Sequence, residues 1–238
     1  MTESPAKSSI TWPGLADQVI TMEAAGLVTR TFRRLDRERQ LNVIHAILDE
    51  MAEHGPEELS IKQVAEHAGV SVGSLYQYFG SRARMVDFAV RLCRQYMDGV
   101  IDGATPYLAG LALPDALLAY VEGGCDWCAQ QASLTRLFAR AAYRGDPQLT
   151  ESLVRPVAAT MYGAVKSMLE RAMTIGEVRQ DLDLDAAAGV VHALTILLGD
   201  TRLLPYLDAY FHLQIDQTDA HRVLRVALDL VMRGIGKS

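Results

Sequence analysis

The 238-residue chain has few cysteines, no long apolar run and no excess of positive charge. Its three cysteines, an odd number, argue against a disulfide framework and favour a reducing cytoplasm. The chain does not open on a basic stretch followed by an apolar run, so a secretory signal is not predicted. The richest apolar stretch, residues 189–199, is shorter than the roughly 18 residues that a membrane span needs. We therefore expect a soluble cytoplasmic protein without a membrane partner.

The formal net charge of −6 excludes a protein coated in positive charge, although the sum can hide a less acidic face. Residues 28–94 contain ten Lys/Arg and nine Asp/Glu, whereas residues 95–238 contain twelve and seventeen. The contents of hydrophobic residues, 50%, and of charged residues, 22%, are those of a globular chain. The N-terminal part therefore suits an anionic partner better than the C-terminal part does.

Motifs that carry enzyme or metal chemistry are also missing. The sequence has no nucleophile elbow, P-loop, dinucleotide fingerprint or HExxH, and its six histidines have no ligand spacing. Asp181, Asp183 and Asp185 alternate as in a calcium loop, but the required Gly and distal Glu are absent. Cys125 and Cys128 have C-x-x-C spacing without a second pair, which favours a buried structural pair over a zinc or redox site. We predict no enzyme activity, no cofactor and no metal.

Almost every segment longer than ten residues has helical spacing of its apolar residues, and alternating strand patterns with Asn-Gly or Asp-Gly turns are missing. The predicted class is all-α. Helices are expected at residues 36–54, 60–68, 71–79, 81 to about 103, 114–131, 133–143, 147 to about 174, 185–198 and 220–232. Asp185 is the expected N-cap of its helix. Pro156 either kinks its segment or stands in the first turn of a second helix, and both alternatives remain open.

Two short helices around Gly69 have the spacing of a helix-turn-helix. Ser60 and Gln63 form a capping box at the start of the first helix, and Ser71 caps the second. Gly69 supplies the left-handed backbone of the turn, and Ala65 is small where the second helix crosses. The second helix would expose hydroxyl, phenol and amide side chains, which suit contacts with phosphates and base edges.

The segment from Ser60 to Arg82, with the helices on either side of it, resembles the tetracycline-repressor (TetR) family of bacterial transcription regulators. The continuation Gly-Ser-Leu-Tyr-x-Tyr-Phe-x-Ser-Arg at residues 73–82 makes the resemblance specific. Ala83 and Arg84 depart from it, because the family often has acidic residues there. The resemblance implies a three-helix DNA-binding domain at 30–82 and a larger helical domain for effector binding and dimerisation at 83–238. Residues 1–29 are a leader of unknown structure that is longer than the family needs.

The resemblance also implies roles for single residues toward double-stranded DNA. The phosphate contacts would be Ser60, Tyr76, Tyr78 and Arg82, and the base-facing residues would be Val72, Gly73, Ser74 and Gln77. Ser71, at which their helix begins, is also expected among the DNA-binding residues. An amide such as that of Gln77 can pair bidentately with adenine. Two alternatives stay open, namely that Tyr78 packs on the first helix and that Val72 only fills space.

Five arginines lie within residues 30–39, ahead of the first helix of the motif. They suit an arm that touches phosphates or enters a minor groove. They equally suit a solvated helix start that Asp36 and Glu38 partly neutralise. The sequence leaves open what the preceding leader, from Trp12 to Leu27, packs against.

The larger helical part suggests a homodimer with an effector. Helices 185–198 and 220–232 are apolar around most of their circumference, which predicts burial against a second subunit and a palindromic operator. A small-molecule effector cavity would be lined by Trp127, Phe138, Tyr143, Met161, Tyr162 and Met168. These residues are alternatively plain core. Repression is the family's usual mode, and the competing hypothesis is a helical protein-interaction module that does not bind DNA.

Overall fold

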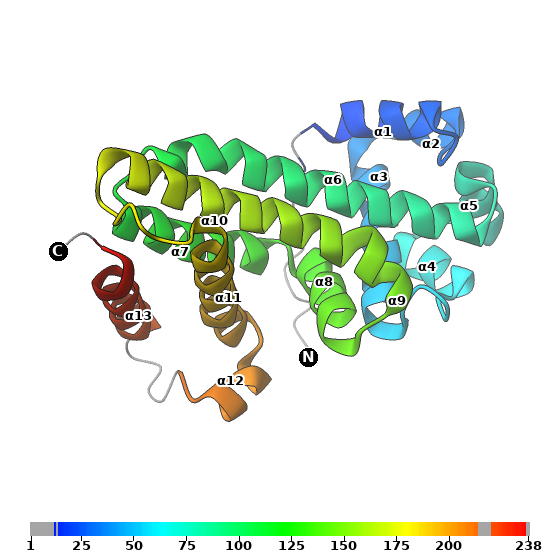
Figure 1. Ribbon diagram of the computed structural model, residues 1–238. Helices are drawn as coiled ribbons and strands as arrows, with labels where there is room; N and C mark the ends of the chain where they lie inside the picture. The colour runs from blue at the N-terminus through cyan, green and yellow to red at the C-terminus, as the bar shows by residue number, and fades with distance from the viewer. Residues whose placement is uncertain (1–11, 13, 214–219, 237–238) are drawn as a thin grey trace. The chain divides into compact units, whose positions relative to one another are not determined.

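A computed structural model describes residues 12, 14–213 and 220–236, and the regular elements in these ranges are all helices (Figure 1). A single antiparallel bridge, between Val178 and Gly236, is the only β-type pairing of the described residues. The all-α class is therefore confirmed. The contacts divide the chain into two compact units, which we call unit 1 and unit 2 and describe separately.

Unit 1 comprises residues 1–96 and 130–156. Its helices are α1 (Leu15–Ala24), α2 (Arg30–Arg33), α3 (Arg37–His54), α4 (Ile61–Ala68), α5 (Val72–Phe79), the first part of α6 (Arg82–Ala109), α8 (Ala132–Arg144) and α9 (Pro147–Leu149), followed by a π-helical turn at Thr150–Val154. The predicted leader is thus partly helical. Unit 1 includes both this leader and the start of α6, so it is wider than the predicted domain of residues 30–82.

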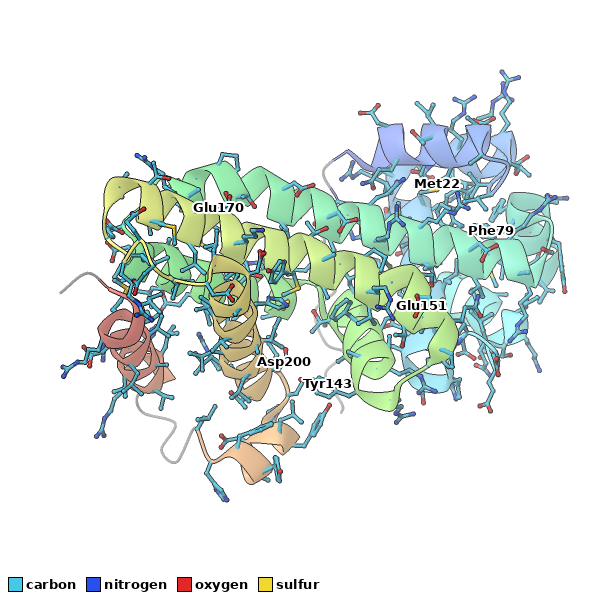
Figure 2. The ribbon with its side chains drawn as sticks, viewed as in Figure 1. Met22, Phe79, Tyr143, Glu151, Glu170 and Asp200 are labelled. Atoms are coloured by element: carbon cyan, nitrogen blue, oxygen red, sulfur yellow. The ribbon has the colours of Figure 1, made fainter. Side chains whose placement is uncertain are left out.

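An aromatic cluster forms part of the core of unit 1. The ring of Phe32 is fully buried and lies 5.2 Å from Phe79 and 5.4 Å from Phe88, measured between ring centroids. Figure 2 labels Phe79 at the end of α5 and Met22, also buried, on α1. Burial of aromatic rings supplies large apolar areas and well-defined packing geometry. Short helices that are marginal alone are therefore held by their tertiary contacts.

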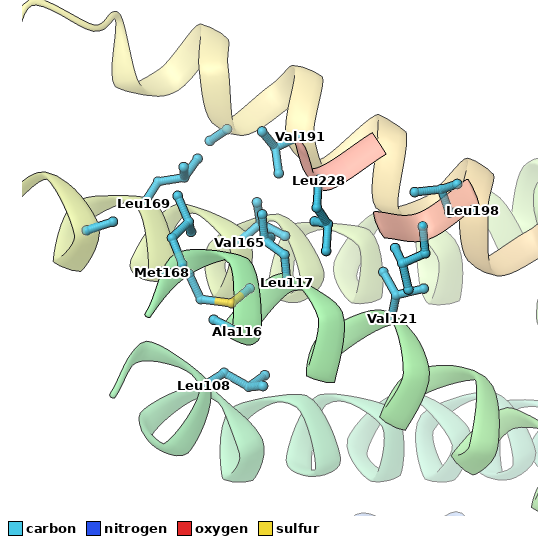
Figure 3. Close-up of a cluster of buried hydrophobic side chains, with 14 of the residues drawn as sticks. Leu108, Ala116, Leu117, Val121, Val165, Met168, Leu169, Val191, Leu198 and Leu228 are labelled. Atoms are coloured by element: carbon cyan, nitrogen blue, oxygen red, sulfur yellow. The ribbon is translucent and has the colours of Figure 1, made fainter. Parts of the chain in front are cut away.

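Unit 2 comprises residues 97–129 and 157–238. Its helices are the second part of α6, α7 (Leu113–Gln130), α10 (Arg155–Ile175), α11 (Leu184–Leu203), α12 (Pro205–Phe211) and α13 (Ala220–Ile235). Figure 3 shows Leu117 of α7, Val165 and Leu169 of α10, Val191 of α11 and Leu228 of α13 in one buried cluster. The short helix α12 was not predicted from the sequence.

Pro156 and Pro106 occupy different places in their helices. Pro156 is the second residue of α10 and follows the π-helical turn, so the second of the two alternatives holds. Its missing N–H does no harm at this position, because the first amides of a helix have no intrahelical acceptor. Pro106 lies inside α6, which continues to Ala109 beyond the predicted end near residue 103.

The N-cap of helix α11 lies two residues before the predicted one. Asp183, not Asp185, is the N-cap residue, and its carboxylate accepts a hydrogen bond from the Ala186 N–H at 3.1 Å. The prediction for Asp185 was therefore wrong, because alternating aspartates offer several equivalent caps. Asp185 instead pairs with Lys166 at 2.6 Å, which raises the pKa of the lysine and lowers the pKa of Asp185.

Helix α11 is also the one described helix that is long and apolar enough to cross a membrane. A core helix of a soluble protein meets the same condition, and Ala188, Val191 and Leu198 of α11 are buried against the other helices of unit 2. Its Val190, in contrast, is 70% exposed. The composition of α11 therefore reflects a buried side together with an apolar side that other described residues leave open.

Candidate functional site

The helix-turn-helix forms as the sequence predicts, except that the Ser60 N–H donates to Glu50 and not to Gln63 of the predicted capping box. The Ser60 hydroxyl accepts the Gln63 N–H at 3.4 Å, and the Ser71 hydroxyl accepts the Ser74 N–H at 3.0 Å. Gly69 has a left-handed backbone with φ of 67° and turns the chain from α4 into α5. These local bonds satisfy amides that the helix cannot satisfy itself.

The exposed side of α5 gathers most of the residues predicted to contact DNA. These are Ser71, Val72, Gly73, Tyr76 and Gln77, which are exposed, and Ser74, which is partly exposed. The phenol of Tyr76 is 48% exposed and Val72 is 39% exposed. Leu75 and Phe79 point inward with only 2% exposure each. The structure therefore places these six residues on one open face of a short, capped helix.

Tyr78 lies elsewhere. It is only 7% exposed, and its ring centroid is 5.8 Å from that of Phe32 on α2. The spacing of Leu75, Tyr78 and Phe79, at i, i+3 and i+4, is the signal that places the three on one buried helix side. Tyr78 thus packs inward, as the alternative had it, although its partner is α2 rather than the first helix of the motif.

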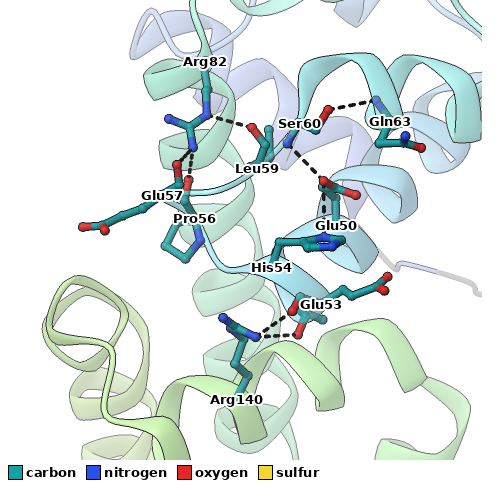
Figure 4. Close-up of polar contacts among 11 residues, drawn as sticks. Glu50, Glu53, His54, Pro56, Glu57, Leu59, Ser60, Gln63, Arg82 and Arg140 are labelled. Atoms are coloured by element: carbon teal, nitrogen blue, oxygen red, sulfur yellow. Dashed lines mark hydrogen bonds and ion pairs between the residues drawn. The ribbon is translucent and has the colours of Figure 1, made fainter.

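Arg82 is anchored inside unit 1 (Figure 4). Its guanidinium donates to the Leu59 carbonyl at 2.9 Å, to the Pro56 carbonyl at 2.8 Å and to the Glu57 carbonyl. A planar guanidinium has five N–H donors, which suits a loop whose carbonyls converge. Arg82 therefore ties the beginning of α6 to the loop between α3 and α4.

Two further residues hold the same loop and were not found from the sequence. Glu50 is 3% exposed, accepts the Ser60 N–H at 3.0 Å and lies 3.4 Å from His54 (Figure 4). Arg140 of α8 donates to the Glu53 carbonyl at 2.8 Å, at the C-terminal end of α3. Ser60 lies 10 residues from Glu50, and Glu53 lies 87 residues from Arg140, so both separations exceed the reach of a capping or turn pattern.

The arginine-rich segment is α2 with its neighbours rather than an extended arm. Arg33 forms an ion pair with Glu23 of α1, and Arg37 donates to the Trp12 carbonyl at 2.9 Å. Arg39 lies 3.3 Å from Asp36, whose carboxylate caps α3. Three of the five guanidiniums therefore have partners within unit 1.

Unit 2 contains an apolar cavity of about 420 Å³. Two of the predicted effector-binding residues, Trp127 and Met161, line it. Tyr162 and Met168 do not: Tyr162 donates to the Asp185 carbonyl at 3.3 Å and Met168 is 2% exposed in the core. The other two predicted residues, Phe138 and Tyr143, lie on α8 in unit 1, where Tyr143 is exposed (Figure 2).

Polar groups in the cavity are few. Asp200 is the one charged residue among the described residues that line it. The hydroxyl of Tyr120 is buried there without a hydrogen-bond partner among the described residues, and burial raises the pKa of this phenol. The Cys125 thiol donates weakly to the Gly199 carbonyl at 3.9 Å, and burial raises its pKa. A high pKa keeps a thiol protonated and poorly reactive.

Comparisons with known proteins agree with this geometry. Residues 43–87 match the family model described as bacterial regulatory proteins, tetR family. The HTH-type transcriptional repressor KstR of Mycolicibacterium smegmatis is 31% identical over 155 residues, which cover 61% of this chain and 68% of that protein.

Solved structures with the same fold are similar along most of their length. A TetR family transcriptional regulator from Chloroflexus aurantiacus has a TM-score of 0.60 at 20% identity, covering 89% of this chain and 99% of that one. The transcriptional regulator FadR from Bacillus subtilis, in complex with stearoyl-CoA, has a TM-score of 0.59 at 16% identity, covering 82% and 98%. With the capped helix-turn-helix, these matches show that the chain belongs to the TetR family of bacterial DNA-binding transcriptional regulators.

Proposed function

We propose that this regulator is a cytoplasmic, ligand-responsive repressor without enzyme activity. It would bind a palindromic operator as a homodimer, with α5 of each protomer in the major groove, and release it when an apolar small molecule enters the cavity of unit 2. A relative named as a repressor, 31% identical over two thirds of its own length, supports the repressor assignment. The open face of α5 supports the assignment of the reading helix.

The presence of glycine at position 73 of α5 is the observation that best supports contact between this helix and DNA. A Cβ atom added at Gly73 meets only the Ser71 hydroxyl oxygen at 3.7 Å, which is an ordinary van der Waals distance. Packing within the described protein therefore does not require glycine, although glycine inside a helix costs about 1 kcal/mol relative to alanine. A close approach of the α5 backbone to another molecule accounts for a glycine at this place.

The test begins with selection of bound sequences from random duplex DNA, which defines the operator. Gly73→Ala should then raise the free energy of unfolding by up to about 1 kcal/mol and weaken operator binding. Gly103→Ala in α6 is the matched control, because it is also a glycine inside a helix and a Cβ there meets nothing within 4 Å. Operator affinity retained by Gly73→Ala would remove the argument for close approach.

Substitutions of base-facing and of phosphate-facing residues should differ in how they change the salt dependence of DNA binding. Gln77→Ala should change the preference at one base position by about 1–3 kcal/mol and leave the salt slope unchanged. Tyr76→Ala should weaken binding to all sequences alike. A protein-interaction module, the competing hypothesis, would show neither selected DNA sequences nor a steep dependence on salt.

Dimerisation through α11 and α13 is proposed from their unpartnered apolar side chains. Val190 on α11 is 70% exposed and Leu230 on α13 is 66% exposed, and both line one groove of unit 2. Apolar side chains of two adjacent helices suit a second copy of the same chain, joined by a two-fold axis. Sedimentation should give a dimer at micromolar concentration, and a stable monomer that retains operator affinity would contradict the proposal.

The cavity predicts the chemistry of the effector. Its lining is apolar, its one charged residue is the acidic Asp200, and a pocket of this size suits a small organic ligand. The effector should therefore have a neutral apolar body and one polar group that pairs with the Tyr120 hydroxyl. The similar FadR is bound to stearoyl-CoA; here the described lining has no cationic side chain for phosphates, so an apolar moiety rather than a phosphate would occupy the cavity.

Helix α6 offers the route from effector to DNA. It is continuous from Arg82, whose guanidinium holds the loop before α4, to Met97 and Ile101, which line the cavity. A ligand that prefers the state with lower DNA affinity reduces operator binding by its differential affinity, typically about 1–3 kcal/mol. A thermal-shift screen of apolar compounds, followed by operator binding, tests this; stabilising ligands that never change operator affinity would contradict it.

A further inference from the structure

The leader ends against the helix that the proposed function assigns to DNA reading. The Thr29 backbone N–H donates to the Tyr78 carbonyl at 2.8 Å, and the Thr29 hydroxyl donates to the Gln77 carbonyl at 2.7 Å. The family-model match begins at residue 43, so Thr29 lies outside the matched segment. Two donors from one leader residue thus meet two consecutive carbonyls of α5.

These two carbonyls are among those that a helix cannot satisfy itself. Helix α5 has only eight residues and ends at Gly80, whose N–H donates to the Tyr76 carbonyl. The last four carbonyls of any α-helix lack intrahelical donors, and helices of this length are marginal without outside contacts. Thr29 therefore completes the C-terminal end of α5 at the very residue, Gln77, that is proposed to read a base.

The residues that follow Thr29 in the sequence hold it in place. Phe32, one turn further along, is fully buried against Phe79 and Phe88. The side-chain amide of Gln40 on α3, which is 7% exposed, donates to the Phe32 carbonyl at 3.2 Å. Helix α2 is therefore fixed both to the aromatic core and to α3, and Thr29 is its N-cap residue.

The other end of the leader is anchored to α6. The ring of Trp12 is fully buried and stacks on Tyr96, with 4.5 Å between centroids and 8° between planes. Arg37 donates to the Trp12 carbonyl, and Glu23 of α1 pairs with Arg33 of α2. The leader from Trp12 to Thr29 thus connects α6 to the end of α5 by contacts that all lie within unit 1.

We propose that Thr29 is a positioning residue for the recognition helix, and that the leader is a brace that sets the orientation of Gln77. This proposal rests on the proposed role of α5 in DNA reading. The direction of the Thr29 hydrogen bonds, toward the α5 backbone, distinguishes a brace from an arm. An arm would use this segment to contact DNA, whereas the brace acts through the α5 backbone. Loss of the Thr29 hydroxyl should therefore alter base preference without removing any DNA contact.

The experiment compares three single variants of the full-length protein. Thr29→Val keeps the shape of the side chain and removes the hydroxyl donor, Thr29→Ser keeps the hydroxyl, and Thr31→Val is the matched control at an exposed threonine of α2. Affinity is measured for the selected operator and for a panel of operators that each carry one base change. Thermal unfolding of each variant is recorded in parallel, so that all affinities refer to folded protein.

Thr29→Val should weaken operator binding about fivefold, the equivalent of one ordinary hydrogen bond. It should also flatten the discrimination at the base position that Gln77→Ala identifies. Thr29→Ser should restore both properties, and Thr31→Val should behave as the wild type. A Thr29→Val protein with lowered thermal stability but unchanged affinity and base preference would overturn the proposal.

Gln77→Ala, measured on the same panel, separates the brace from the recognition role. If Gln77→Ala changes the ranking of the operators and Thr29→Val does not, the recognition role stands and the brace is wrong. If neither variant changes the ranking, α5 does not read DNA through Gln77, and the brace fails with it. Changes at the same base position in both variants support the brace.

Discussion

Unit 1 and unit 2 differ in where their polar side chains find partners and where buried polar atoms are left without one. In unit 1, side chains donate to carbonyls at helix ends: Arg82 and Arg140 hold the loop around α3 and α4, and Thr29 and Gln40 hold α5 and α2. Unit 1 leaves Trp12 Nε1 and Gln18 Oε1 without a hydrogen-bond partner among the described residues, and unit 2 leaves the Tyr120 hydroxyl and His192 Nδ1. Of these four residues, Tyr120 lines the cavity. An unpartnered buried polar group costs free energy that a ligand can recover.

Their apolar surfaces differ as well. The aromatic residues Phe32, Phe79 and Phe88 of unit 1 are buried, whereas unit 2 contains a cavity of about 420 Å³ and exposes Val190 and Leu230. A closed core transmits and preserves geometry, because packed side chains have few alternative arrangements. Open apolar surface is instead a place where a ligand or a second subunit gains affinity. The comparison assigns fixed geometry to unit 1 and adaptable binding to unit 2.

The largest expected effect is a break in the core of unit 1. Phe32→Ala should lower the free energy of unfolding by about 3–5 kcal/mol, since a fully buried ring leaves a cavity that the neighbours only partly fill. Tyr210→Ala on α12, where the side chain is 80% exposed, is the control and should change it by less than about 0.5 kcal/mol. Chemical denaturation followed by circular dichroism measures both; similar losses in the two variants would refute the prediction.

A charge introduced on the exposed apolar side of unit 2 should weaken dimerisation and leave the stability of the folded monomer nearly unchanged. Leu230→Asp should leave the stability of the monomer nearly unchanged, because the side chain is 66% exposed, yet weaken dimerisation by about 2–3 kcal/mol. Arg222→Asp, on the exposed polar side of α13, should leave dimerisation intact. Sedimentation over a concentration series gives the dissociation constants. A Leu230→Asp protein that remains as dimeric as the wild type would place the interface elsewhere.

Arg82→Lys tests whether the guanidinium fork or the charge matters. A lysine ammonium cannot reach three carbonyls at once, so the free energy of unfolding should fall by about 1.5–2 kcal/mol. The salt slope of DNA binding should persist, because the charge is retained. Arg84→Lys, two residues along α6, is the control. An unchanged denaturation midpoint would show that the three hydrogen bonds contribute little.

Features that depend on short-range interactions were predicted from the sequence, whereas features that depend on long-range interactions were not. Ser60, Gly69 and Ser71 were predicted correctly because a cap or a turn is decided within three or four residues. Thr29 and Arg140 were missed because their acceptors lie 48 and 87 residues away, and nothing local marks a donor for a distant carbonyl. Local signals therefore identified the motif but not what holds it in position.

The sequence indicated which residue types line the cavity, but not which individual residues do so. Aromatic and methionine side chains indicate an apolar interior, and Trp127 and Met161 do line the cavity. The same residue types on α8, Phe138 and Tyr143, belong to unit 1, because helical spacing gives the apolar side of a helix without its neighbour. Assignment to one cavity needs the tertiary arrangement of the helices.

Tyr120→Phe should stabilise the unliganded protein. Removing a buried hydroxyl that has no partner among the described residues should raise the free energy of unfolding by about 1 kcal/mol. Tyr162→Phe is the matched control and should not stabilise, since that hydroxyl donates to the Asp185 carbonyl. The same Tyr120→Phe variant should bind effectors more weakly, as followed by the fluorescence of the cavity-lining Trp127. Stabilisation together with unchanged ligand affinity would separate the phenol from ligand recognition.

The smallest expected effect is a dependence of stability on pH. Burial lowers the pKa of His192 in unit 2 and of His45 in unit 1, where nearby Asp49 opposes the shift. The folded state then binds fewer protons than the unfolded state, so the free energy of unfolding rises with pH in this range. The stability that the uncharged histidines contribute is complete above the ordinary histidine pKa of about 6.5. It is lost as pH falls below that value toward the lowered folded-state pKa.

Thermal unfolding measured from pH 7.5 to 5.5 should therefore give a falling midpoint. His192→Gln should reduce this fall, because glutamine has no proton to gain, and the further change His45→Gln should reduce it again. The two units can be told apart by following Trp127, in unit 2, in a Trp12→Phe background. If the double variant lost stability with pH as steeply as the wild type, carboxylates rather than these histidines would control the acid sensitivity of both units.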